Sequence, residues 1–165
     1  ISIPDTVTEI DSYAFENCTS LTRVTIPNSV IKIGGWSFKG CTSLTSVIIP
    51  NSVTEIAAST FENCTSLTEF IIPNSLTTIS SNLFNGCSSL TNITIPSSVT
   101  SIGNDAFTGC ALKEVHIEST NPPKTYDCIC GSEYISTCTL YVPKGSANTY
   151  KNADYWKEFI NILEE

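Results

Sequence analysis

The sequence of 165 residues contains no methionine and a single histidine, and charged residues make up only 15% of it. Its eight lysines and arginines are outnumbered by 16 aspartates and glutamates, which gives a net charge of -8. Nucleic acids and anionic lipids are bound through cations that neutralise phosphate, so this balance argues against a nucleic-acid partner. A single histidine also argues against zinc sites built from histidine and paired cysteines. We therefore expect no nucleic acid, no metal and no cofactor.

Long apolar runs are missing as well. No stretch comes near the roughly 20 apolar residues that a membrane-spanning helix needs, so we expect no transmembrane segment in this chain. The first four residues, Ile1 to Pro4, lack the charged start and the apolar run of a signal peptide. Because the chain also lacks an initiator methionine, we expect that it was processed or excised from something longer.

The sequence does have a period of 23 residues, visible in three series of identical residues. They are Pro4, Pro27, Pro50, Pro73 and Pro96; Phe15, Phe38, Phe61, Phe84 and Phe107; and Cys18, Cys41, Cys64, Cys87 and Cys110. This period predicts five repeats over residues 1–117, with the N-terminus starting in mid-repeat and one deletion near Ala111. Since nothing in the sequence covers that first coil, we expect that more repeats preceded it.

Each repeat contains a segment with the pattern of a strand. Residues 21–26 alternate apolar and polar residues at their end, as a strand with one buried face does. The copies of this segment are residues 44–49, 67–72, 90–95 and 112–117. The proline that follows cannot donate to a strand ladder and so ends the strand. Residues 30–33 and their copies predict a second, shorter strand or extended turn on the opposite side of the coil.

A turn separates the second apolar pair from the next strand. Residues 11–18 lead to a position that holds only asparagine or glycine, namely Asn17, Gly40, Asn63, Gly86 and Gly109. These two residue types tolerate the left-handed conformation just past a helix end, so we predict a single helical turn here. One unit has no means of burying its apolar residues alone, whereas stacked copies align them in internal columns.

The pattern changes after Ile117, and residues 118–165 read as a C-terminal capping segment of the same domain. A last strand returns at residues 139–143. Further on, four apolar residues have the spacing of one helical stripe: Trp156, Phe159, Ile160 and Leu163. We predict that a helix with this stripe seals the end of the stack, as solenoids require.

The repeat is similar to that of the BspA-type leucine-rich repeat family. The resemblance lies in residues 18–30 followed by Ile33 and Phe38, and in the cap at residues 139–146 and 155–159. It implies a leucine-rich repeat solenoid: a parallel β-strand stack with short helical turns and a C-terminal β/α cap. It also implies a bacterial cell-surface or secreted protein of the adhesion type that is not an enzyme, with a protein or glycan partner on a host or neighbouring cell surface. The alternative is a structural spacer, or the terminal segment, of a longer surface protein.

The candidate binding residues are those at outward positions of the predicted strands, which vary while the inward positions stay apolar. They are Arg23, Thr25, Ser46, Ile48, Glu69, Ile71, Asn92, Thr94, Glu114 and His116. Ile48 and Ile71 stand out as apolar residues in successive coils, although strand propensity alone also favours β-branched residues there. A second candidate is the exposed aromatic pair of Tyr13 and Trp36, which occupy equivalent places in neighbouring coils.

The remaining candidates favour structural interpretations. The five cysteines in register are expected to be buried free thiols, because their fixed place marks a column of small hydrophobic residues. For Cys128, Cys130 and Cys138 both a packing role and one disulfide in the cap stay open. His116 shares a coil with Cys110, but no third orienting group is identifiable, so we interpret it as a surface histidine and predict no catalytic residues.

Overall fold

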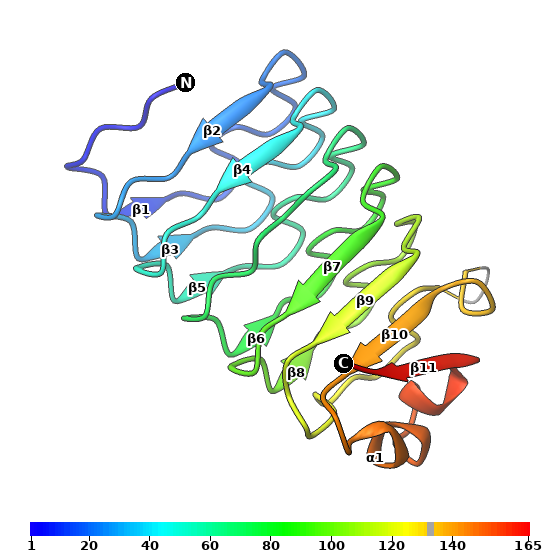
Figure 1. Cartoon of the computed structure of the whole chain (residues 1–165). Helices are drawn as coiled ribbons and strands as arrows, with labels where there is room; N and C mark the ends of the chain where they lie inside the picture. The colour runs from blue at the N-terminus through cyan, green and yellow to red at the C-terminus, as the bar shows by residue number, and fades with distance from the viewer. Residues whose placement is uncertain (132–133) are drawn as a thin grey trace.

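The computed structural model, which describes residues 1–131 and 134–165, shows a solenoid of parallel strands stacked coil upon coil (Figure 1). The longer strands lie on one side of the stack: β2 (Arg23–Thr25), β4 (Ser46–Ile48), β7 (Asn92–Ile95), β9 (Glu114–Ile117) and β10 (Thr139–Val142). The two-residue strands lie on another side: β1 (Glu9–Ile10), β3 (Lys32–Ile33), β5 (Glu55–Ile56), β6 (Thr78–Ile79) and β8 (Ser101–Ile102). The predicted solenoid fold is therefore confirmed.

The 23-residue period sets the register between coils. Arg23 pairs with Ser46 between β2 and β4, and Thr25 pairs with Ile48. Because side chains alternate across a strand, a matched register keeps every inward residue facing the core. Val24 pairs with Val47 in this way, and both side chains are buried.

The ladder of longer strands is interrupted in one predicted segment. Residues 67–72 contain an isolated bridge, from Ile71 to Thr94, where we predicted a strand. The inward position here is Phe70, which replaces the valine or isoleucine of the neighbouring coils. Its ring packs edge-on against Phe61 and Phe84, with ring centroids 5.1 and 4.6 Å apart. We attribute the interruption to this larger ring.

A column of phenylalanines runs through the centre of the stack. The rings of Phe15, Phe38, Phe61, Phe84 and Phe107 are stacked with centroids 5.0, 5.5, 5.9 and 5.3 Å apart. Phe15 at the N-terminal end is half-buried, and the other four are buried. The column therefore joins the coils into a continuous core, as the repeat pattern predicted.

The segment before each longer strand differs from the predicted helical turn. Residues 11–18 form a series of hydrogen-bonded turns in which alternate backbone N–H groups point to the next coil. Tyr13 donates to the carbonyl of Gly35 at 3.0 Å, and Phe15 donates to that of Ser37 at 2.7 Å. In an α-helical turn these N–H groups would bond within their own segment. Hydrogen bonding between coils therefore outweighs the local helical preference.

The position limited to asparagine and glycine has the predicted left-handed backbone. The φ angles are 56° at Asn17, 70° at Gly40, 60° at Asn63, 75° at Gly86 and 76° at Gly109. Residues other than glycine or asparagine adopt this conformation at a cost, which explains the restriction.

The C-terminal cap corrects one prediction. After β10 it contains a short helix α1 (Ala147–Lys151), a 3-10 turn η1 (Trp156–Glu158) and a strand β11 (Asn161–Glu164). Trp156 and Phe159 are buried as predicted, but Ile160 and Leu163 are exposed, so the predicted helical stripe is wrong. The physical reason is that β11 pairs in parallel with β10 and satisfies the backbone edge that a helix would leave open.

Candidate partner-binding surface

The outward residues of the longer strands form a continuous surface, which we call the strand face. It consists of Arg23, Thr25, Ser46, Ile48, Glu69, Ile71, Asn92, Thr94, Glu114 and His116. Strand register aligns them in two files, as in the pairs Arg23 with Ser46 and Asn92 with Glu114. Most of them are exposed; the half-buried members are Ser46, Glu114 and His116. The structure thus brings the sequence-derived candidates together on one side of the solenoid.

Two isoleucines dominate the apolar part of the strand face. The side chain of Ile48 is 65% exposed and that of Ile71 is 82% exposed. They border a depression of about 330 Å³ whose rim includes Arg23, Ser46 and Glu69. A second depression of about 350 Å³ lies between Ile71 and β7, where the strand ladder is interrupted. The surface around Ile71 is therefore both apolar and hollowed.

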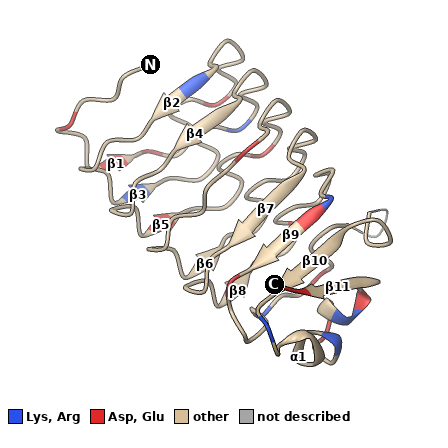
Figure 2. Ribbon diagram, viewed as in Figure 1, with Lys and Arg blue, Asp and Glu red and all other residues tan. Residues whose placement is uncertain are grey.

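Charge is sparse over this part of the strand face. Figure 2 shows that β4, β7 and β10 carry neither acidic nor basic residues. The charged residues of the strand face are Arg23 in β2, Glu69 in the interrupted segment and Glu114 in β9. Hydroxyl groups contribute to the remaining surface. Thr25 is exposed next to Ile48, and Thr94 is exposed next to Ile71. Such a surface offers apolar contact and hydrogen bonds rather than a strong field.

The C-terminal end of the strand face is covered by residues of the cap. The ring of His116 stacks on that of Tyr141 from β10, with centroids 4.5 Å apart. The Nδ1 atom of His116 lies 3.0 Å from a carboxylate oxygen of Glu165, and its Nε2 atom lies 3.7 Å from one of Glu114. Tyr141 and Glu165 were missed in the sequence reasoning. Aligning the strand before Pro143 with the repeat strands would have placed Tyr141 beside His116.

The second candidate, the aromatic pair, comes from the turn segments. The rings of Tyr13 and Trp36 are stacked 5.2 Å apart and nearly parallel, and their side chains are 54% and 36% exposed. Both residues have positive φ, 64° and 57°, which is unusual for bulky side chains. In the following coils the same position holds Ser59, Asn82 and Asp105, also with positive φ. Asn82 and Asp105 are residue types that tolerate this conformation, but Tyr13 and Trp36 are not, and we did not predict the positive φ at this position.

The five cysteines in register are free thiols, and burial lowers the reactivity of four of them. Cys41, Cys64, Cys87 and Cys110 are buried, and each sulfur donates a hydrogen bond to a phenylalanine carbonyl of the preceding coil. Burial raises the pKa of Cys41 to about 11 and that of Cys64 to about 12. Because the thiolate is the reactive form, these thiols are chemically inert at neutral pH. Cys18 at the N-terminal end is half-buried.

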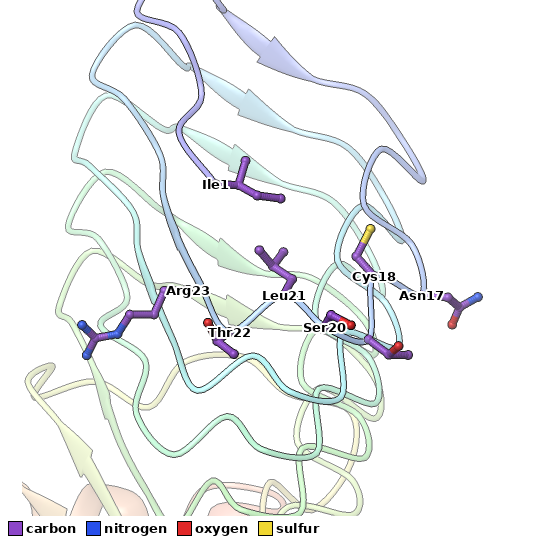
Figure 3. Close-up of a pocket in the computed structure, with 8 residues that line it drawn as sticks. Ile1, Asn17, Cys18, Ser20, Leu21, Thr22 and Arg23 are labelled. Carbon is purple, nitrogen blue, oxygen red and sulfur yellow. The ribbon is translucent and has the colours of Figure 1, made fainter.

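The depression at the N-terminal end of the stack is lined by residues of the core columns, and we do not interpret it as a ligand-binding site. Figure 3 shows Ile1 above Leu21, with Arg23 and Asn17 extending to opposite sides. This depression, of about 490 Å³, is also lined by Cys18. Leu21 and Cys18 are the first members of columns that are fully enclosed further along, so we assign no ligand to this depression.

The family resemblance is confirmed by comparison with models of protein families. The model of the BspA type leucine rich repeat region matches residues 1–113 in six copies. The chain belongs to this family. No match was found among curated proteins. The family assignment therefore rests on the repeats that form the strand face and the phenylalanine column.

Two solved structures share the fold of this BspA-type chain. The crystal structure of the T. pallidum leucine rich repeat protein is 27% identical with a TM-score of 0.69, and the match covers 100% of this chain and 70% of that one. The pneumococcal vaccine antigen PcpA is 22% identical with a TM-score of 0.79; the match covers 100% of this chain but 41% of PcpA. At this identity the likeness to PcpA shows the fold alone.

Neither a metal centre nor a spanning helix is found in the described part of this BspA-type chain. Among residues 1–131 and 134–165, no group of three histidine, cysteine, aspartate or glutamate side chains is arranged to hold a metal ion. Within the same residues, no helix is long and apolar enough to cross a membrane. Leucine-rich repeat solenoids typically provide extended surfaces for protein interactions.

Proposed function

We propose that this chain is a recognition module of an adhesion-type surface protein, without catalytic activity, and that it binds a protein partner through the strand face. The observation that carries the proposal is the pair of highly exposed isoleucines, Ile48 and Ile71, in successive coils. The family resemblance supports a cell-surface or secreted location.

The composition of the strand face fits a protein contact. Protein interfaces have an apolar centre within a polar rim, and here Ile48 and Ile71 are bordered by Arg23, Ser46 and Glu69. Full burial of an isoleucine side chain contributes about 1.5–3 kcal/mol, so the pair supplies a sizeable share of a moderate affinity. A glycan would instead be bound by polar groups and aromatic faces, so a protein is favoured for this surface.

The proposal is tested by replacing Ile48 and Ile71 together with threonine. Threonine keeps the β-branch that suits a strand while removing apolar contact area. Binding of the parent and of the double variant to extracellular-matrix proteins and to host cells is measured in parallel. We expect the variant to bind at least about tenfold more weakly, because about 1.4 kcal/mol of lost contact suffices for that change.

The matched control is Ile31→Thr, because Ile31 is also an exposed isoleucine, 51% exposed, but lies outside the strand face. It should bind like the parent, and circular dichroism should show that all variants are folded. Unchanged binding by the folded double variant would exclude this surface and direct attention to Tyr13 and Trp36. Absence of binding by the parent itself would favour the alternative, a structural spacer in a longer surface protein.

A further inference from the structure

Two cysteines of the cap lie in direct contact. The Sγ atoms of Cys130 and Cys138 are 3.0 Å apart, and the thiol of Cys130 donates a hydrogen bond to the sulfur of Cys138. Both residues are fully buried. They are separated by eight positions in the sequence, and Cys138 lies immediately before β10, the first strand of the cap.

This arrangement distinguishes the pair from the cysteines in the repeats. The sulfur of Cys64 donates to the carbonyl oxygen of Phe38 at 3.1 Å, and that of Cys87 donates to Phe61 at 3.1 Å. Each of the four buried repeat thiols thus has a backbone carbonyl as its hydrogen-bond acceptor. In Cys130 and Cys138 each sulfur has the other sulfur as its partner.

We propose that Cys130 and Cys138 are an oxidation site, at which a small-molecule disulfide converts the two thiols to one intramolecular disulfide. A sulfur–sulfur bond is about 2.05 Å long, so a shift of about 1 Å from the observed contact forms it.

The hydrogen bond also assigns an order to the two thiols. The hydrogen bond from Cys130 lowers the pKa of Cys138, and the same interaction, together with burial, raises the pKa of Cys130. As the acceptor of this hydrogen bond, Cys138 is the better placed of the two to carry the negative charge, so we assign it the nucleophilic role, because the thiolate is the reactive form.

The exchange balances in two steps. While the cap is still folding and Cys138 is accessible, its thiolate attacks one sulfur of the small-molecule disulfide, whose sulfur–sulfur bond breaks and releases one thiolate that takes up a proton. Cys130 then gives up its proton and attacks the sulfur of Cys138, which expels the second small thiol. Two protein thiols are oxidised by two electrons, and one small disulfide is reduced to two thiols.

The expected consequence is a more rigid cap. The new bond would close the short loop between Cys130 and Cys138, which already contains a hydrogen bond from the Cys138 backbone N–H to the Tyr134 carbonyl at 2.9 Å. Closing a loop of this size is expected to raise the Tm on the order of 5 °C. The inference does not depend on the proposed binding function.

The test uses the whole chain. The protein is denatured, reduced, freed of reductant and refolded in a buffer of a small disulfide and its thiol. It is then denatured again and alkylated, and its intact mass is measured. We expect six of the eight cysteines to be alkylated, so the chain should be lighter by the mass of two alkyl groups than the reduced form, in which all eight are alkylated. Alkylation of all eight after refolding would overturn the proposal.

Proteolysis identifies the bonded pair. Trypsin leaves residues 125–144 in one peptide, and chymotryptic cleavage after Tyr134 separates Cys130 from Cys138. The two fragments should remain joined until reductant is added, with the alkyl group on Cys128. The control variant Cys128→Ser should keep this link and Cys130→Ser should lose it. A disulfide that involves Cys128 or a repeat cysteine would contradict the proposal. Mass-spectrometric fragmentation of the linked peptides from the parent protein identifies the bonded cysteines without any variant.

Discussion

The side-chain oxygen of Asn63 fills the space into which a Cβ atom on Gly86 would project. The same relationship joins Asn17 and Gly40. Each asparagine of this column therefore requires glycine in the next coil, for a steric reason that adds to the positive φ of 75° at Gly86. Gly109 differs, because its neighbour in the preceding coil is Gly86, whose closest atoms are 3.3 Å away from such a Cβ.

This relationship predicts unequal costs for two similar substitutions. Gly109→Ala should lower the free energy of unfolding by about 1–2 kcal/mol, the cost of a left-handed residue with a Cβ. Gly86→Ala should cost about 0.5–1.5 kcal/mol more, because it also forces the side chain of Asn63 out of its present position. In an Asn63→Gly background the cost of Gly86→Ala should fall to that of Gly109→Ala. Denaturant unfolding of the four variants measures this, and equal costs in both backgrounds would refute the steric argument.

Phe61 should be among the most costly residues to truncate. Its buried ring lies between those of Phe38 and Phe84, with centroids 5.5 and 5.9 Å away. We expect Phe61→Ala to lower the free energy of unfolding by about 3–5 kcal/mol, through lost burial and a residual cavity. Phe15→Ala, at the half-buried end of the column, is the control and should cost less. A change below about 1 kcal/mol for Phe61→Ala in denaturant unfolding would show that the column is not the core.

Removal of a single hydroxyl should weaken the cap. The buried Tyr150 donates a hydrogen bond of 2.8 Å to the carbonyl oxygen of Ser119. Tyr150→Phe leaves this carbonyl without its partner, which should cost about 1–2 kcal/mol. Tyr126→Phe removes a hydroxyl from a side chain that is 54% exposed and should be nearly neutral. Thermal unfolding followed by near-ultraviolet circular dichroism compares the two, and equal effects would argue against the hydrogen bond.

The buried thiols predict a loss of stability in alkali. Burial raises the pKa of Cys64 to about 12 in the folded chain, from 9.0 when unperturbed. Above about pH 9 the unfolded chain therefore releases this proton first, and the free energy of unfolding falls by up to about 1.4 kcal/mol per pH unit until the pH reaches the folded pKa. Below pH 9 this thiol contributes no pH dependence. Unfolding curves between pH 8 and 11 should show a steeper fall for the parent than for Cys64→Ala, and parallel curves would contradict the assignment.

The sequence was sufficient to predict the parts of the fold that repeat. A residue such as Phe61 has copies one period before and after it, so its burial follows from the stacking of coils. The left-handed backbone at Asn63 follows for the same reason, since the copies at this position are limited to asparagine and glycine. The positions of Ile48 and Ile71 on the strand face followed from alternation along the strand.

The cap was harder to predict because it does not repeat. Trp156 and Phe159 have helical spacing and are both buried, but Ile162 rather than Ile160 continues the buried series. This switch of period reflects the pairing of β11 with β10, a tertiary interaction that local spacing does not record. Likewise, the contact of Cys130 with Cys138 depends on the tertiary structure of the cap. The spacing of these cysteines in the sequence therefore did not decide between a packing role and a disulfide.

The proposed contact surface is tested most directly by photo-cross-linking. A photoreactive residue is placed at Ile71, which is 82% exposed, and separately at Ile31, which is 51% exposed and lies outside the strand face. Each folded variant is incubated with host cells or extracellular-matrix proteins that bind the parent, and then irradiated. We predict a covalent adduct from position 71 and none from position 31. An adduct from position 31 without one from position 71 would contradict the assignment of the strand face as the binding surface.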